Sequence, residues 1–151
     1  MKKKIVLIVS VVVAAIIILI IAIPTEKDRV KKDIKSLKSA VESENNAETL
    51  KFLDEEYKDK YNIDYKEFTA LINDFFRQFD SIKVVMSGLK VTIDSIDKQK
   101  NVFAQCSLGL KVFAKYGGDR VLIFGGVIKP TPIRAYLRKT DTQYKIYYTE
   151  Y

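Results

Sequence analysis

The sequence predicts an α+β domain behind an N-terminal transmembrane helix, with about three helices packed on a curved four-stranded antiparallel sheet. An unbroken apolar stretch opens the 151-residue chain. Apolar residues then recur at helical spacing as far as Phe79, and from Ser81 onward they alternate with a period of two. Helices followed by strands is the order expected of an α+β domain with two layers around one core.

The predicted anchor runs from Ile5 to Ile23, directly after a short basic tail, and its only polar residue is Ser10. As a helix it would span about 28 Å, which matches the hydrocarbon core of a bilayer. A cleaved signal peptide shares the basic start. However, its apolar stretch is shorter and ends in a small-x-small site, which the residues before Pro24 do not offer. We therefore expect residues 1–24 to be a membrane anchor and residues 25–151 to be one soluble domain.

The orientation of the anchor has two interpretations. Lysines and arginines follow the helix between Lys27 and Lys38, and a positive-inside count would place the domain in the cytoplasm. Those residues are interleaved with acidic ones, and a very short basic tail against an apolar stretch is typical of a signal anchor that exports the domain behind it. We expect a single-pass membrane protein with its domain outside the cytoplasm, in contact with membrane lipid through the anchor.

Composition excludes several kinds of chemistry. The chain has no histidine and one cysteine, Cys106. Histidine-based acid–base catalysis, histidine metal ligands, a Cys-His nucleophile and an internal disulfide are therefore ruled out, and no cofactor is expected. The net charge of +7 is spread among acidic residues and not gathered on one basic face, which disfavours nucleic acid as a partner.

Three helices are expected between the anchor and the sheet. The first carries an apolar stripe of Val30, Ile34, Leu37 and Val41. The second is expected to begin at Asn46 as its cap and to bury Leu50, Leu53 and Tyr57.

The third expected helix is the most hydrophobic. Asp64 and Glu67 fit a capping box that opens it. Its face of Phe68, Leu71, Phe75 and Phe79 is interpreted as a core helix laid across a sheet. An aromatic-lined ligand cavity is the alternative.

The strands are predicted from alternation. Ile82 to Ile93 forms the first, with a phase slip at Ser87-Gly88 that indicates a β-bulge. Val102 to Ala114 is a long, curved strand, and Tyr116 to Asp119 reads as a hairpin turn. Val121 to Ile128 follows, then alternating segments around Ala135 and Ile146, separated by a turn at residues 140–143. The expected sheet is an antiparallel meander of four long, bent strands, although the alternating segments number five.

This element order resembles the NTF2-like, or cystatin-like cone, superfamily over residues 26–151. The resemblance rests on the segment from Phe75 to Ile82, which leads from helix to first strand. It also rests on the final hairpin from Ala135 to Tyr148, in which Tyr144 stands where tryptophan is common. It implies a cone-shaped pocket between helices and sheet, in a superfamily that includes isomerases, dehydratases and domains that only bind or assemble.

The pocket implied by the resemblance is expected to include Tyr57, Phe75, Phe79, Met86 and Cys106. The inward strand residues are aliphatic or small, and no convergent polar set appears. We therefore expect a membrane-tethered, non-catalytic binding or assembly module at the cell envelope, whose partner is a protein or a small apolar ligand. The alternative is a small-molecule isomerase or dehydratase that uses Asp and Tyr, and a buried Asp bonded to Tyr in the pocket would favour it.

Overall fold

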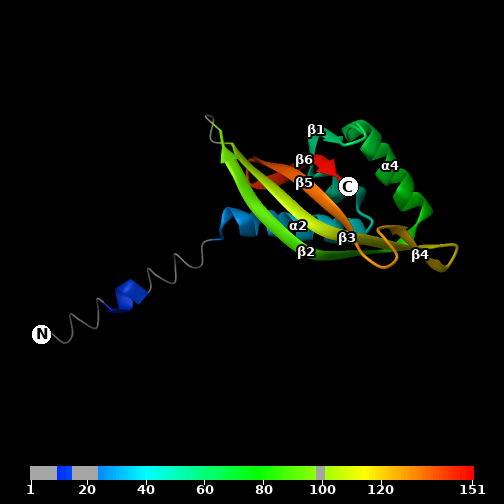
Figure 1. Ribbon diagram of the computed structural model, residues 1–151, viewed down its shortest axis with the longest axis horizontal. Helices are drawn as coiled ribbons and strands as arrows, with labels where there is room; N and C mark the ends of the chain where they lie inside the picture. Colours follow the sequence, from blue (N-terminus) through cyan, green and yellow to red (C-terminus); the bar gives the residue numbers. More distant parts are fainter. Residues whose placement is uncertain (1–9, 15–23, 98–100) are drawn as a thin grey trace, which may run out of the picture.

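The computed structural model describes residues 10–14, 24–97 and 101–151. Helices α2, α3 and α4 combine with a six-stranded sheet in a two-layer α+β arrangement (Figure 1). The elements in chain order are α2 (Glu26–Glu42), α3 (Asn46–Leu50), β1 (Leu53–Asp59), α4 (Tyr65–Gln78), β2 (Asp80–Ile96), β3 (Val102–Tyr116), β4 (Asp119–Phe124), β5 (Thr131–Thr140) and β6 (Gln143–Glu150).

The predicted anchor, Ile5 to Ile23, lies almost wholly outside the described residues. Among the helices of the described ranges, none is both long and apolar enough to cross a membrane.

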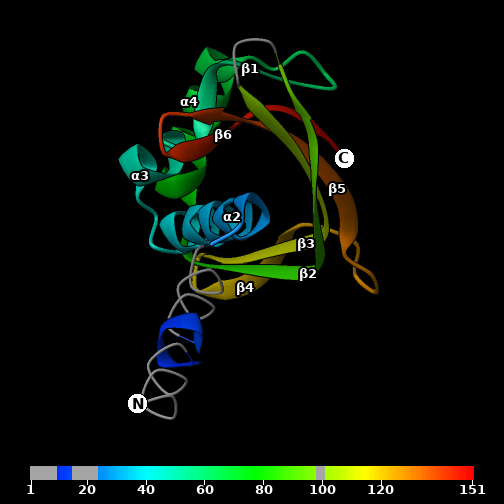
Figure 2. The ribbon, with the colours of Figure 1, turned by 90° about the vertical axis from the view of Figure 1, so that its left-hand side faces the viewer.

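The sheet is strongly curved and mixed. Its strand order is β1-β6-β5-β3-β2, and β4 pairs with the end of β3 that β5 leaves free. All pairs are antiparallel except β1 with β6, which is parallel. Seen on edge, the sheet curls around α2, and the three labelled helices lie on its concave side (Figure 2).

The prediction of four antiparallel strands is wrong in number and in direction. Five of the six strands are the alternating segments after residue 79, including the short β4. The sixth, β1, occupies Leu53 to Tyr57, which helical spacing had assigned to the second helix. That helix is only five residues long and its cap is Asn45, not Asn46. The segment is a strand because it pairs with β6, which lies far away in sequence and which local periodicity does not reveal.

Helix α2 supplies one side of the core. Its predicted stripe is confirmed, because Val30 and Ile34 are buried against the sheet and Leu37 and Val41 pack beside them. The helix begins with a capping box between Thr25 and Asp28. Helix α2 contacts mainly β2, and the buried cluster that it joins also includes residues of β1, β3, β5 and β6.

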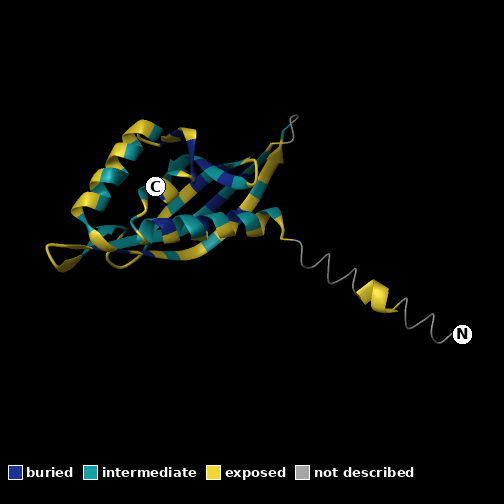
Figure 3. Cartoon of the chain, turned by 180° about the vertical axis from the view of Figure 1, so that it is seen from behind, coloured by how far each residue is buried: buried dark blue, intermediate teal, exposed yellow. Residues whose placement is uncertain are grey.

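Helix α4 begins with the predicted Asp64–Glu67 capping box. It is not the buried core helix that its sequence indicates, since none of its residues is fully buried and Leu71 is 54% exposed. Figure 3 shows only intermediate and exposed residues along this helix. Its apolar face does turn inward, but much of that face lies over an unfilled space.

The bends of the sheet agree with the predicted signals. Pairing of β2 with β3 shifts register between Ser87 and Lys90, where Gly88 has a φ of +63°. This is the bulge that the phase slip predicts. Strand β3 and the turn after Tyr116 are also as expected, whereas β4 ends at Phe124 and leaves Val127 and Ile128 in an exposed loop.

Candidate functional site

An apolar cavity of about 370 Å³ lies between the helices and the concave face of the sheet. Aliphatic and aromatic side chains form nearly all of its wall. They are Ile34, Leu37 and Val41 of α2; Leu53 and Tyr57 of β1; Ile63, Phe68, Leu71 and Ile72 at α4; and Val84, Met86, Cys106, Leu108, Leu110, Val112, Phe124, Ile133, Ala135 and Ile146 of the sheet.

The cavity exists because α4 stands away from the sheet. The residues at its C-terminal end, Phe75, Phe76 and Phe79, pack on a small buried cluster that includes Ile82 and Val84. At the other end, Phe68 packs edge to face on Tyr57, with ring centroids 5.4 Å apart. Between these two supports, the inward side chains of α4 face the cavity and not a packed core.

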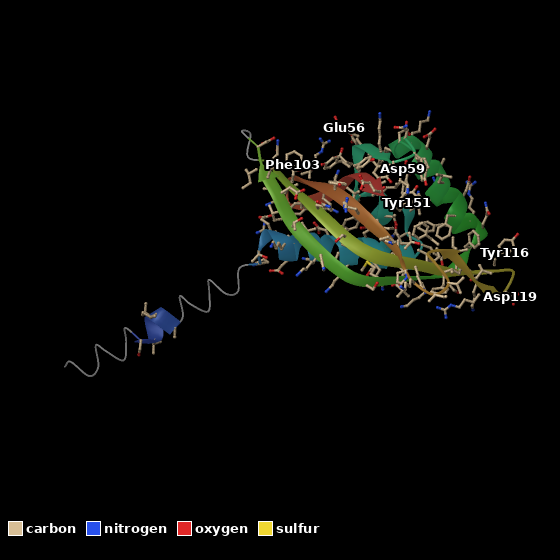
Figure 4. The ribbon with its side chains drawn as sticks, in the orientation of Figure 1. Glu56, Asp59, Phe103, Tyr116, Asp119 and Tyr151 are labelled. Atoms are coloured by element: carbon tan, nitrogen blue, oxygen red, sulfur yellow. The ribbon has the colours of Figure 1, made fainter. Side chains whose placement is uncertain are left out.

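Two hydrogen-bonded pairs form the polar end of the cavity. The hydroxyls of Tyr57 and Thr149 lie 2.8 Å apart, and the Tyr151 hydroxyl donates to Asp59 over 2.6 Å. All four residues line the cavity, and they come from β1 and from β6 and the residue after it. Figure 4 labels Asp59 and Tyr151 beside the end of β6.

The Asp59 carboxylate accepts three hydrogen bonds. One oxygen accepts the backbone N–H groups of Tyr61 and Ile63 at 2.8 and 2.9 Å, and the other accepts Tyr151. Burial alone would raise the pKa of Asp59, but these hydrogen bonds outweigh it and hold the pKa below its ordinary value. The same contact raises the pKa of Tyr151, where burial is the larger cause. A carboxylate that accepts three hydrogen bonds and has a lowered pKa is a weak base, and here it holds the strand end to the residue after β6.

The Tyr57–Thr149 pair differs from the Asp59–Tyr151 pair. Two hydroxyls carry two O–H donors, and their mutual bond uses one of them. Burial raises the pKa of Tyr57, with the Thr149 bond opposing it, so its hydroxyl stays protonated. Within the described residues no other hydrogen bond of Tyr57 is found. The pair therefore offers a donor to a carbonyl, ether or carboxylate oxygen in the cavity.

The structure places the expected pocket residues in two groups. Tyr57, Met86 and Cys106 line the cavity, whereas Phe75 and Phe79 lie outside it, in the cluster that supports α4. Asp59, Thr149 and Tyr151 were missed. The only sequence signal for Asp59 is its position two residues after Tyr57, which puts both side chains on the same face of β1. That signal was not available because the strand itself was missed.

Cys106 lies in the sheet wall with no exposed surface. Burial raises its pKa to about 11, so the thiol is protonated and unreactive at neutral pH. Among the described residues, no group of acidic and cysteine side chains is arranged to hold a metal ion.

No family model matches the chain, and no curated protein matches it in sequence. Solved structures do match in three dimensions. A helical cell shape determining protein from Campylobacter jejuni aligns with a TM-score of 0.64 at 17% identity, over 83% of this chain and 41% of its own. A putative aromatic ring hydroxylase from Novosphingobium aromaticivorans aligns at 0.62 and 11%, over 82% and 85%. A putative dehydratase of the NTF2-like family from Streptomyces avermitilis aligns at 0.62 and 9%, over 82% and 92%.

The chain has the NTF2-like fold. The expected fold is thereby confirmed for the domain, with six strands in a mixed sheet in place of four. The chain spans less than half of the cell shape protein it matches. At these identities the similarity shows the fold alone, and an NTF2-like fold carries both enzymes and binding proteins, so the cavity must decide between them.

Proposed function

We propose that this chain is a non-catalytic binding module, tethered to the membrane at the cell envelope, whose cavity takes a small apolar ligand. The cavity carries the proposal. Its volume of about 370 Å³ equals that of roughly a dozen water molecules at about 30 Å³ each. Water needs two or more polar partners, and this wall offers few of them, chiefly at the end formed by Tyr57, Thr149, Asp59 and Tyr151. An apolar guest with one oxygen at that end fits the wall best.

The tether is supported by sequence. The apolar stretch ends at Ile23, and α2 begins at Glu26, so only Pro24 and Thr25 stand between the proposed single-pass anchor and the domain. The domain would then sit directly at the membrane surface, outside the cytoplasm. The proposal also allows the module to bind a protein partner.

Binding in the cavity can be tested with benzene, a small apolar probe. The full chain, methyl-labelled and held in detergent micelles, is titrated while methyl NMR signals are followed. We expect shifts at cavity methyls such as those of Ile34 and Ile146, with none at Ile96 on the exposed hairpin. Shifts spread evenly over the protein, or no shifts, would contradict the proposal.

A cavity-filling variant sharpens this test. Leu108→Trp adds an indole at the wall and should abolish the benzene shifts. Ile123→Trp is the matched control, because Ile123 is also half-buried on the sheet but packs in the cluster below α4, outside the cavity. It should leave the shifts unchanged. Retained binding in Leu108→Trp would place the probe elsewhere.

The alternative function, an isomerase or dehydratase, is favoured by one observation: a buried aspartate is bonded to a tyrosine at the cavity wall. A general base of this kind needs a raised pKa, whereas the pKa of Asp59 is lowered by the three hydrogen bonds that its carboxylate accepts. Carboxyl NMR titration of Asp59 decides between the two. A value below its ordinary range supports the module, and a value of about 6 or more would favour the enzyme.

A further inference from the structure

The convex face of the sheet carries a second surface, which shares Leu108, Ile133 and Tyr151 of its lining with the cavity. The three labelled helices all cover the concave side, so no helix of the described residues covers the convex side (Figure 2). A groove crosses it, lined by residues from β2, β3, β5, the end of β6 and the β4–β5 loop. Four cationic side chains and a single carboxylate surround the groove: Lys60, Lys90, Lys129, Arg134 and Glu150.

Small residues form the floor of this groove. Ser87, Gly88, Ser107 and Gly109 lie there on adjacent strands. A side chain at Gly109 would come within 2.9 Å of Pro130, so the glycine lets the β4–β5 loop lie against the sheet. Lys111 fixes the same loop by donating to the carbonyls of Val127 and Ile128 at 2.9 and 3.3 Å. The wall that carries Lys129 is therefore held in place.

The charges of the groove are mostly uncompensated. Only Arg134 reaches Glu150, at 3.4 Å across an exposed pair. The Lys60 ammonium lies over the rings of Tyr61 and Tyr151 at 4.8 and 4.7 Å. Within the part of the chain that the structure describes, neither Lys90 nor Lys129 has an ion-pair partner. The groove is therefore complementary to an anion.

An aromatic ridge continues the groove along the same face. Arg134 pairs with Ser107, and two positions further Tyr136 pairs with Gln105 and Tyr148. Phe103 and Tyr147 complete the ridge, with ring centroids 5.7 to 6.5 Å apart along it. Phe103 and Tyr136 alternate with the buried Ala104, Ala135 and Leu137, so they point outward. Tyr147 and Tyr148 lie at a register shift between β5 and β6, which places both rings beside Tyr136. All four residues are half-buried.

The groove and the ridge together form one strip along β5. From Arg134 to Arg138 it extends about 13 Å, at about 3.3 Å per residue. It offers aromatic rings, tyrosine hydroxyls, Ser107 and Gln105 beside lysine and arginine. Rings supply apolar contact, and hydroxyl and amide groups bond a ligand rich in hydroxyls. The cations require that this ligand also carry negative charge.

We propose that this strip binds a strand of acidic polysaccharide, with its sugar rings on Tyr136 and its neighbours and its acidic groups in the basic groove. Single-stranded nucleic acid is less well matched. It stacks its bases on open ring faces, whereas the rings here are tilted against one another by 47 to 87°.

The test uses polygalacturonate as the acidic probe, neutral dextran as its control and oligothymidylate as the nucleic-acid rival, each titrated against the full chain in detergent. We expect polygalacturonate to bind, more weakly as salt rises, and dextran not to bind. The triple variant Lys90→Gln, Lys129→Gln, Arg134→Gln should weaken binding about tenfold. The control Lys31→Gln, Lys32→Gln, Lys35→Gln removes the same charge from the exposed face of α2 and should change binding less than twofold.

The ridge has its own variant. Tyr136→Ala should weaken binding of polygalacturonate about fivefold, whereas Tyr116→Ala, on an exposed ring at the β3–β4 turn (Figure 4), should not. The substitutions in the triple variants lie on the surface, so those variants still test the proposal if Tyr136→Ala fails to fold. Absence of binding, or equal losses in both triple variants, would overturn the proposal. Tighter binding of oligothymidylate, lost in the same variants, would overturn it in favour of nucleic acid.

Discussion

The hydroxyl of Tyr144 donates a hydrogen bond of 2.5 Å to the Glu26 carboxylate, across 118 positions in sequence. Tyr144 is fully buried, and Lys139 pairs with the same carboxylate at 2.9 Å. The Tyr144 backbone N–H also donates a hydrogen bond of 2.8 Å to the Asp33 carboxylate. The β5–β6 hairpin is therefore fastened to the first turns of α2, next to the proposed membrane anchor.

Tyr144→Phe should lower the free energy of unfolding by about 2 kcal/mol, because it removes a buried hydrogen bond to a charged group while keeping the ring. Urea unfolding of the full chain in detergent, followed by near-ultraviolet circular dichroism, measures this. Tyr61→Phe is the control: its ring is 63% exposed, and the change should cost less than about 0.5 kcal/mol. Equal effects would mean that the Glu26 bond does not hold the hairpin.

The stability of the domain should fall in acid. Hydrogen bonds from Tyr144 and Lys139 lower the pKa of Glu26. In Asp54 and Asp59, burial alone would raise the pKa, but hydrogen bonds, from Arg138 and Tyr151 among others, outweigh it and lower the pKa. A carboxyl whose native pKa is lowered stabilises the fold above its unfolded value, near 4, and loses that contribution as pH falls through the native value.

We therefore expect a constant free energy of unfolding from these groups between pH 5 and 7 and a progressive loss below about pH 4. Urea midpoints measured across that range test this. Asp59→Asn removes one of the carboxyl groups that titrate. The free energy of unfolding of this variant should therefore fall less below pH 4 than that of the parent chain. An unchanged acid slope in this variant would show that the native fold does not lower the pKa of Asp59.

Cys106 should be inert in the folded chain. It has no exposed surface and its pKa is raised to about 11, so a polar disulfide reagent at pH 8 meets neither an accessible sulfur nor a thiolate. Reaction in native solution should be slower by orders of magnitude than in concentrated urea, which serves as the control. Rapid labelling of the native chain would show that the cavity opens to solvent.

Phe75→Ala should lower the free energy of unfolding by about 2 to 3 kcal/mol, at the lower end for removal of a large ring because Phe75 is only half-buried. The ring lies 5.2 Å from Phe79 and supports α4 on the sheet. Lys51→Ala, at an exposed position paired only with Glu48, should cost under about 0.5 kcal/mol. The same urea assay compares them, and a Phe75→Ala as mild as Lys51→Ala would mean that α4 does not depend on this cluster.

Local sequence signals predicted the parts of this fold that depend on neighbouring residues. The capping box at Asp64, the bulge after Ser87 and the turn at Tyr116 are each determined within a few positions. Strand β1 was missed because Leu53 and Tyr57 are four residues apart, a spacing shared by a helical face and by one side of a strand. Only the distant partner, β6, distinguishes the two.

The cavity could not be predicted in the same way. The apolar face of α4 indicates burial, and the side chains do turn inward, but sequence does not reveal how far a helix stands from its sheet. The ends of α4 rest on Phe79 and Tyr57, and its middle spans a gap. The polar end of the cavity joins Asp59 and Tyr151, 92 positions apart, which no local pattern connects.

The pairing of β1 with β6 also has a consequence for how the protein is made. Among the described residues, the only neighbour of β1 in the sheet is β6, whose pairing extends to Thr149. A ribosome therefore completes α2, α3, α4 and five strands, β1 included, before the partner of β1 exists. Until then Asp59 lacks Tyr151 and one wall of the cavity is missing, so a growing chain would expose its apolar interior. The domain closes only after β6 has emerged, so its sheet cannot be completed by folding the first elements as they leave the ribosome.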